Sequence, residues 1–136
     1  MSLAEKQKLL IEDLSVIEDA QERLAVVVDR ARRLPPFPAA ERTDAYRVRG
    51  CVTAVWLIGA LREGRCTFRC DAEGPLVKGL VHLLCDCFDD GTPAEILASE
   101  IDPLEALGLT RQLSPTRRNG LTAVRHAIRA FAEHAA

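Results

Sequence analysis

The sequence of 136 residues contains no long apolar run and no strong excess of charge of either sign. No stretch approaches the roughly 20 apolar residues of a membrane-spanning helix, and the polar N-terminus lacks the apolar core of a signal peptide. The 18 basic and 20 acidic side chains leave a formal net charge of −2, which argues against broad nucleic-acid binding. We therefore expect a cytoplasmic protein that binds neither membranes nor nucleic acids.

The composition is typical of one folded domain. Hydrophobic residues make up 48% of the chain and charged residues 28%, a balance that distinguishes globular proteins from disordered ones. The length is sufficient for a core of its own, and no internal repeat or low-complexity segment divides the sequence. Residues 1–136 are therefore predicted to form a single domain.

Helical patterns fill the first part of the chain. Apolar residues at helical spacing predict a helix over residues 3–14, and Asp19 followed by Glu22 resembles a capping box for a second helix. Three closely spaced prolines end that second helix, so residues 35–47 are predicted to be a loop. The buried stripe of the second helix is expected to consist of Leu24, Val27, Val28, Ala31 and Leu34.

A β-hairpin is predicted in the middle of the sequence, followed by further helices. Residues 52–61 are apolar and β-branched near their start, which is typical of a strand buried on both faces. Glu63-Gly64 is a turn signal, and residues 66–71 alternate as a second strand. Later helices are predicted to begin at Pro75, Thr92-Pro93, Asp102-Pro103 and Ser114-Pro115. This order predicts an α+β fold with a small antiparallel sheet packed against helices.

Five cysteines allow three interpretations: core residues, metal or disulfide ligands, and reactive thiols. An odd number cannot be fully paired within one chain, so we expect free thiols in a reducing compartment. Cys66 and Cys70 share a strand face but lie roughly 13 Å apart, at about 3.3 Å per residue. Cys85 and Cys87 point to nearly opposite sides of a helix, because each residue turns about 100°. Neither pair can therefore chelate one ion as a unit, so no metal site is expected from these four cysteines.

Core packing is the default interpretation for these four cysteines, because free cysteine behaves as a small hydrophobic residue. His82 falls outside the apolar stripe of its helix and is expected to be a partly exposed polar residue. A metal site that combines Cys51 with single ligands from distant segments stays open as an alternative.

Cys51 differs from the other four cysteines in its sequence surroundings. Gly50 allows a tight backbone turn, and the loop before it can present a reactive side chain. Arg47 and Arg49 add positive charge, which favours the thiolate. The three histidines show no recognisable catalytic triad, so sulfur or disulfide exchange fits better than hydrolysis.

Four short motifs occur in the order and spacing of one known family. They are "RLP" at 33–35, "ERTDAYRVRGCVTAVWL" at 41–57, "LVKGL" at 76–80 and "LTRQLSPTRRNGL" at 109–121. With these motifs the chain resembles the SufE family of sulfur acceptors. The family pattern around the cysteine is close to V-x-G-C-x-S-x-V-W, and here Thr53 replaces its serine and Val52 a usual glutamine.

The resemblance implies an α+β fold like that of the IscU scaffold proteins, with no bound cofactor. It implies that Cys51 accepts persulfide sulfur from a pyridoxal-phosphate cysteine desulfurase of the SufS/CsdA type and stimulates that enzyme. The sulfur would then pass to an Fe–S scaffold complex of the SufBCD type. Gly50 would shape the loop, Arg117 would orient the loop or the partner, and Trp56 would help to shield the persulfide.

Other functions stay open at this stage. An IscU-type metal-binding or Fe–S scaffold module has the same fold class, and an interaction domain would use its cysteines only for packing. Whether the protein acts as an enzyme in its own right is left open, and a homodimer is compatible with the sequence.

Overall fold

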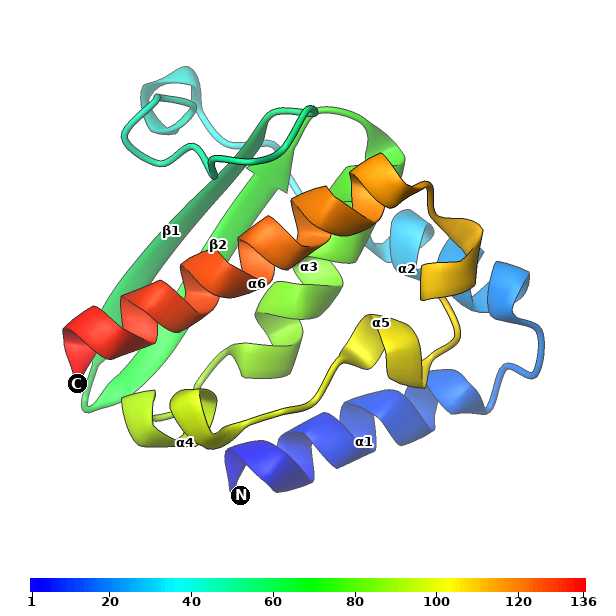
Figure 1. The fold of residues 1–136 in the computed structure, drawn as a ribbon, viewed down its shortest axis with the longest axis horizontal. Coiled ribbons are helices and arrows are strands. Elements are labelled where there is room, and N and C mark those ends of the chain that lie inside the picture. The colour runs from blue at the N-terminus through cyan, green and yellow to red at the C-terminus, as the bar shows by residue number, and fades with distance from the viewer.

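The chain forms six α-helices and one antiparallel β-hairpin, so the predicted α+β class is confirmed (Figure 1). The computed structural model describes all residues from 1 to 136. The elements in chain order are α1 (Leu3–Ser15), α2 (Ala20–Arg32), a 3₁₀ turn (Ala39–Glu41), β1 (Val55–Arg62), β2 (Arg65–Ala72), α3 (Pro75–Phe88), α4 (Pro93–Ala98), α5 (Pro103–Ala106), a second 3₁₀ turn (Thr110–Gln112) and α6 (Pro115–Ala135). None of the helices is long and apolar enough to cross a lipid bilayer.

The hairpin has the turn that the sequence predicts. Its strands pair along their whole length, from Val55 opposite Ala72 to the residues that flank the turn. Glu63 and Gly64 both have positive φ angles, 50° and 78°. Positive φ at both central residues is the backbone geometry of a tight two-residue hairpin turn.

The predicted boundaries and burial of the first strand were correct only in part. The strand begins at Val55 rather than Val52, and the side chain of Val52 is 81% exposed in the loop before it. Burial on both faces holds only at the start of the strand, where Val55 and Trp56 are both buried, and Leu61 is exposed at its far end. The apolar run therefore contains the end of a loop as well as a strand.

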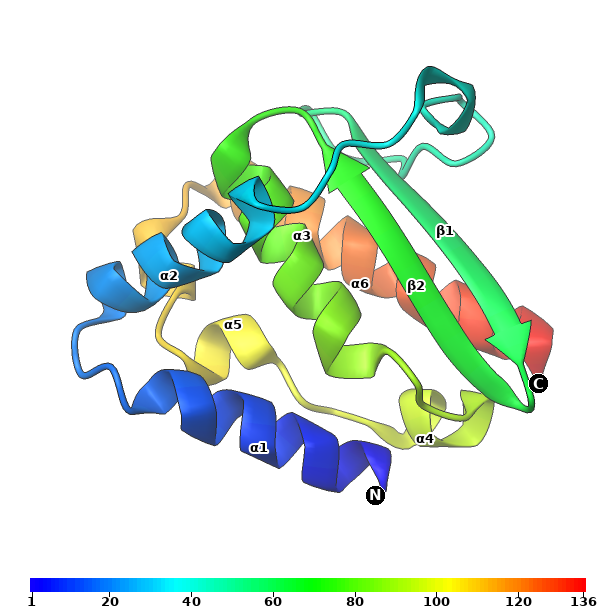
Figure 2. The ribbon, with the colours of Figure 1, turned by 180° about the vertical axis from the view of Figure 1, so that it is seen from behind.

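The core lies between the hairpin and helices α3 and α6, which pack against the same face of the sheet (Figure 1). Helix α2 packs on α3 from the side away from the strands (Figure 2). The contact between α6 and the hairpin requires a glycine, since a Cβ on Gly59 would lie 2.6 Å from the ring of Phe131. Phe131 meets Phe68 edge to face, with ring centroids 5.6 Å apart. This packing fixes α6 across the sheet.

The predicted helix starts are confirmed where capping signals are strong. Thr92, Asp102 and Ser114 each accept hydrogen bonds from backbone N–H groups in the following turn. Such caps satisfy donors that have no partner within the helix. Pro75 occupies the first position of α3, as predicted.

Helix α2 matches its prediction only in part. Asp19 caps the helix by accepting from the N–H of Gln21, but Glu22 does not complete a capping box. Val27 and Ala31 are buried, as expected. Leu34 is exposed, and its assignment to the buried stripe was wrong, because the helix ends before the prolines and leaves Leu34 in the following loop.

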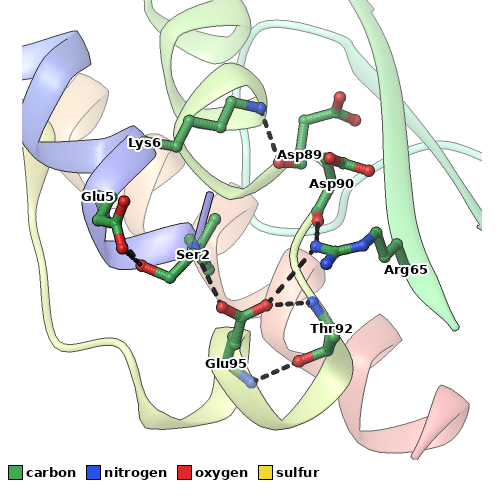
Figure 3. A network of polar contacts seen from close by, with 9 residues as sticks. Ser2, Glu5, Lys6, Arg65, Asp89, Asp90, Thr92 and Glu95 are labelled. Atoms are coloured by element: carbon green, nitrogen blue, oxygen red, sulfur yellow. Dashed lines mark hydrogen bonds and ion pairs between the residues drawn. The ribbon is translucent and has the colours of Figure 1, made fainter.

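Polar contacts fix the start of α1 at the end of the molecule away from the loop before β1 (Figures 1 and 3). The carboxylate of Glu95 accepts a hydrogen bond from the N–H of Leu3 at 2.8 Å and lies 3.9 Å from the guanidinium of Arg65. Lys6 donates to the carbonyl oxygen of Asp89 at 2.7 Å. These contacts join α1 to α4, β2 and the end of α3.

Candidate functional site

Cys51 lies in a short loop, residues 49–54, that is held at both ends. Before it, the N–H of Val48 donates to the carbonyl oxygen of Val55 at 2.8 Å. After it, the carbonyl oxygen of Ala54 accepts a hydrogen bond from the backbone beyond β2 at 3.0 Å. Val48 and Ala54 are both buried. The freedom of the chain to move is therefore confined to the few residues around Cys51.

Gly50 gives this loop its turn. Its φ of +92° is in the region that favours glycine, which matches the turn predicted at this position. A Cβ at Gly50 would also lie 3.2 Å from the Cβ of Ala123 in α6. A side chain at this position would therefore strain the backbone and push the loop away from the helix.

The Cys51 thiol is in direct contact with α6. It donates a hydrogen bond to the carbonyl oxygen of Gly120, with 3.1 Å between sulfur and oxygen. Gly120 leaves space beside the sulfur, since a Cβ there would lie 3.6 Å from the Cys51 Sγ. Two motifs far apart in the sequence, at 41–57 and 109–121, therefore meet at the cysteine.

An apolar pocket of about 240 Å³ lies beside Cys51. Its walls come from the cysteine loop, β1, α3 and α6, and its polar side chains belong to the loop and to the start of α6. The main apolar residues of the walls are Val55, Val77, Leu80, Val81, Leu121 and Val124. The pocket can hold an additional small group on the cysteine without repacking the core.

The surroundings of Cys51 favour the protonated thiol. Burial raises the pKa of Cys51, and the positive charge of Arg47 offsets only part of that increase. The hydrogen bond to Gly120 acts in the same direction as burial, because a carbonyl oxygen accepts only from the S–H form. Arg47 favours the thiolate, as predicted, but desolvation outweighs its charge in this conformation.

Arg117 lies at the edge of the pocket, in the first turn of α6. Ser114 fixes the backbone there by accepting a hydrogen bond from the Arg117 N–H at 3.3 Å. The Arg117 side chain is exposed and forms no ion pair within the chain. The structure thus brings Gly50, Cys51 and Arg117 together, and the guanidinium is available to a ligand or partner.

A buried carboxylate that the sequence patterns did not reveal holds the loop before β1. Asp71, on β2, is 1% exposed, and one of its oxygens accepts hydrogen bonds from the N–H of Phe37 and from Arg42, both at 2.8 Å. Its other oxygen accepts from the Ala72 N–H at 2.9 Å and lies 3.7 Å from the Lys78 ammonium. Burial alone would raise the pKa of Asp71, but these hydrogen bonds and the lysine charge hold it below its usual value.

Trp56 lies on the face of the hairpin opposite to the pocket. Its neighbour Val55 lines the pocket, and successive side chains of a strand point to opposite faces, so Trp56 points away from the pocket. On that face the guanidinium of Arg42 lies 4.8 Å from the centroid of the Trp56 ring. Trp56 is buried. The expectation that it shields the sulfur of Cys51 was wrong, because α6 and Val55 cover the thiol instead.

The other four cysteines are buried and unpaired, which agrees with the predicted packing role. The fold nevertheless places Cys70 of β2 beside Cys85 and His82 of α3, a contact that the spacing within each segment did not predict. His82 is half-buried, as expected. No group of three or more His, Cys, Asp or Glu side chains is arranged to hold a metal ion, so the metal-scaffold alternative gains no support.

Known proteins resemble this chain in sequence and in fold. A family model described as "SufE: Fe-S metabolism associated domain" matches residues 8–132. The chain belongs to the SufE family. A SufE-like protein from Rhizobium meliloti (strain 1021), described as uncharacterized, is 30% identical over 131 residues, which cover 91% of this chain and 92% of that protein. SufE family membership implies a role in Fe–S metabolism.

The fold is shared with a hypothetical protein from Thermus thermophilus. Its solution structure has a TM-score of 0.76 to this chain and covers 96% of this chain and 95% of its own. The two sequences are 23% identical, so the likeness shows that the SufE-family fold is common to both.

Proposed function

We propose that Cys51 accepts sulfane sulfur from the persulfide of a cysteine desulfurase, stimulates that enzyme and relays the sulfur to an Fe–S cluster scaffold. The observation that carries the proposal is the position of the thiol. Cys51 is the one cysteine that is not buried, and it lies on a short loop beside an apolar pocket. Membership of the SufE family supplies the connection to Fe–S metabolism.

The proposed transfer replaces one S–S bond by another and needs no external oxidant or reductant. The Cys51 thiolate attacks the terminal sulfur of the donor persulfide, and the S–S bond of the donor breaks. The donor cysteine leaves as a thiolate and takes up a proton, while Cys51 becomes the persulfide. Thiolates rather than thiols carry out such exchange reactions, so Cys51 must first lose its proton.

The resting contacts of Cys51 explain why a partner is needed. The hydrogen bond to Gly120 and the partial burial keep the sulfur protonated and turned toward α6. Movement of residues 49–54 about Gly50 would break that hydrogen bond and bring the sulfur into the charged surface around Arg47 and Arg117. Near those guanidinium groups the pKa of the thiol would fall, because opposite charge favours the thiolate.

The pocket supports the second half of the proposal, in which the sulfur is carried. A persulfide reacts readily with reductants, and the apolar side chains of Val55, Val81 and Val124 line one side of the loop and offer such molecules no polar contact. The volume of about 240 Å³ is ample for the added sulfur atom. When the loop returns, the sulfur would be stored beside α6 until the scaffold draws it out.

The proposal is tested with purified cysteine desulfurase and L-cysteine, by measuring alanine formation with and without this protein. We expect the wild-type chain to accelerate alanine formation and Cys51→Ser to give no acceleration, since a hydroxyl cannot accept the sulfur. Cys66→Ala is the matched control, because it removes a buried thiol elsewhere and should act like the wild type. Equal acceleration by Cys51→Ser would contradict the proposal.

A further inference from the structure

The pocket beside Cys51 has an apolar part and a polar part. Valine and leucine side chains of β1, α3 and α6 form most of its walls. Its polar side chains are one arginine and three hydroxyl residues, namely Arg117, Ser114, Thr116 and Thr53. No acidic residue and no histidine line the pocket. The polar part therefore carries a single positive charge that no carboxylate in the pocket neutralises.

Helix α6 brings this positive charge close to the sulfur. Arg117 and Gly120 are three residues apart in the helix, and residues at that spacing lie on the same side of a helix. The carbonyl oxygen of Gly120 accepts the hydrogen bond from the Cys51 thiol, at 3.1 Å. Arg117 therefore lies one helical turn from the sulfur, and both residues line the same pocket.

The polar groups at the start of α6 are free to bind a ligand. The Arg117 side chain is exposed and has no ion-pair partner in the chain. The Ser114 hydroxyl oxygen accepts a hydrogen bond from the Arg117 N–H, so its own proton is left to donate. Together these groups suit the oxygen atoms of a small anion, because a guanidinium forms its strongest hydrogen bonds with charged oxygens.

The apolar part of the pocket suits a different end of the same ligand. Its space of about 240 Å³ far exceeds the roughly 30 Å³ that one water molecule occupies in the liquid, so a small anion fits beside the thiol. Sulfur is polarizable and forms only weak hydrogen bonds, so apolar walls accept it more readily than they accept charged oxygen. The pocket is thus matched to an anion with oxygens at one end and sulfur at the other.

We propose that Cys51 also accepts sulfur from thiosulfate, whose sulfonate oxygens bind Arg117 and Ser114. In that position the terminal sulfur of thiosulfate points away from the guanidinium, into the apolar space beside the Cys51 sulfur. The inference rests on the proposed function in one respect, since both require Cys51 to carry an additional sulfur atom. It differs in the donor, which is here a small anion rather than a protein persulfide.

The reaction replaces one S–S bond by another. Cys51 loses its proton to water, and its thiolate attacks the terminal sulfur of thiosulfate. The S–S bond of thiosulfate breaks, and sulfite leaves with the bonding electron pair. Cys51 becomes the persulfide, and no external oxidant or reductant takes part. Only the thiolate reacts, so the rate should rise with pH.

The test uses the purified full chain and thiosulfate at constant ionic strength, without a desulfurase. Peptide mass spectrometry follows the tryptic peptide 50–62, which contains Cys51 and should gain one sulfur atom, about 32 Da. The rate should level off as the thiosulfate concentration rises, because the anion binds before it reacts, and sulfate should compete with it. Cys51→Ser should gain no sulfur. A rate that never levels off, an added sulfonate group in place of sulfur, or no uptake by the wild type would overturn the inference.

Two neighbouring arginines provide a matched test of anion recognition. Arg117→Gln removes the charge from the pocket, whereas Arg118→Gln removes the next charge along α6, which does not line this pocket. For each variant, the rate of sulfur uptake from thiosulfate is divided by the rate at which the neutral reagent iodoacetamide alkylates Cys51. This ratio should fall about tenfold or more in Arg117→Gln, through the loss of a charge-assisted hydrogen bond, and should keep its wild-type value in Arg118→Gln. Equal ratios in the two variants would overturn the assignment of Arg117.

The same preparations are also loaded with sulfur by a cysteine desulfurase and L-cysteine, so that the two proposals can fail separately. Uptake from the desulfurase but not from thiosulfate would overturn this inference alone. Uptake from thiosulfate but not from the desulfurase would support it and contradict the proposed protein donor. Uptake from neither would overturn both.

Discussion

Asp71→Asn is expected to loosen the loop that leads to Cys51. The amide has the shape of the carboxylate but lacks its charge, and only its single oxygen can accept hydrogen bonds. In the native protein the two oxygens accept from the Phe37 and Ala72 N–H groups and from Arg42, with Lys78 3.7 Å away. At least one of these buried donors loses its partner in the variant.

The expected loss of stability at neutral pH is about 2–4 kcal/mol. A hydrogen bond to a charged group contributes about 1.5–3 kcal/mol, and leaving a buried donor unsatisfied costs about 1–3 kcal/mol. Domains of this size are stable by about 5–15 kcal/mol, so the variant should remain folded. The native contacts lower the pKa of Asp71 in the folded protein. Their contribution to stability is therefore fully present above the pKa of an unfolded aspartate, about 3.9, and is lost as the pH falls through the pKa of Asp71 in the folded protein.

Urea unfolding followed by circular dichroism measures this difference at pH 7 and at pH 3. The free energy of unfolding of the wild-type protein should exceed that of Asp71→Asn at pH 7, and the difference between the two should be smaller at pH 3. Native-state alkylation of Cys51 should also be several-fold faster in the variant, because the loop opens more often. Glu41→Gln is the control. Glu41 lies on the same loop as Arg42, but it pairs with Arg69 of β2, outside the buried cluster around Asp71. Equal effects of the two substitutions would refute the reasoning.

Three further substitutions probe the surroundings of Cys51. Trp56→Ala should cost about 3–5 kcal/mol in a denaturation experiment, because the ring is buried; intact stability with lost desulfurase binding would make it an interface residue instead. Arg117→Ala should change stability by less than about 0.5 kcal/mol but weaken desulfurase stimulation; a large loss of stability with normal transfer would make it structural. Gly120→Ala should stabilise α6 by about 0.5–1 kcal/mol yet slow sulfur acceptance, because the new methyl group lies 3.6 Å from the Cys51 sulfur; an unchanged rate would show that the sulfur does not use this space.

Local sequence signals predicted much of the fold. Thr92, Asp102 and Ser114 cap helices because their side chains satisfy N–H groups in the next turn, a need that neighbouring residues alone determine. The Glu63-Gly64 turn and the turn at Gly50 were predictable for a similar reason, since both require positive φ angles.

The features that were missed depend on contacts between distant segments. Val52 has a side chain that suits a strand, and only the approach of α6 to Cys51 shows that the chain is still a loop there. Asp71 is an ordinary acidic residue in sequence, yet it is buried because the loop before β1 folds over it. The effect of burial on the Cys51 thiol could not be read from its basic neighbours, because they reveal charge but not desolvation.

The central claim is that Cys51 carries the transferred sulfur, and peptide mass spectrometry tests it most directly. The protein is incubated with a cysteine desulfurase and L-cysteine, then alkylated and digested with trypsin without reduction. Cys51 is the only cysteine in the tryptic peptide 50–62, which should gain one sulfur atom, about 32 Da, that a reductant removes. Cys51→Ser should gain no sulfur on any peptide. Sulfur on a peptide that contains another cysteine, or its uptake by Cys51→Ser at the wild-type rate, would contradict the account.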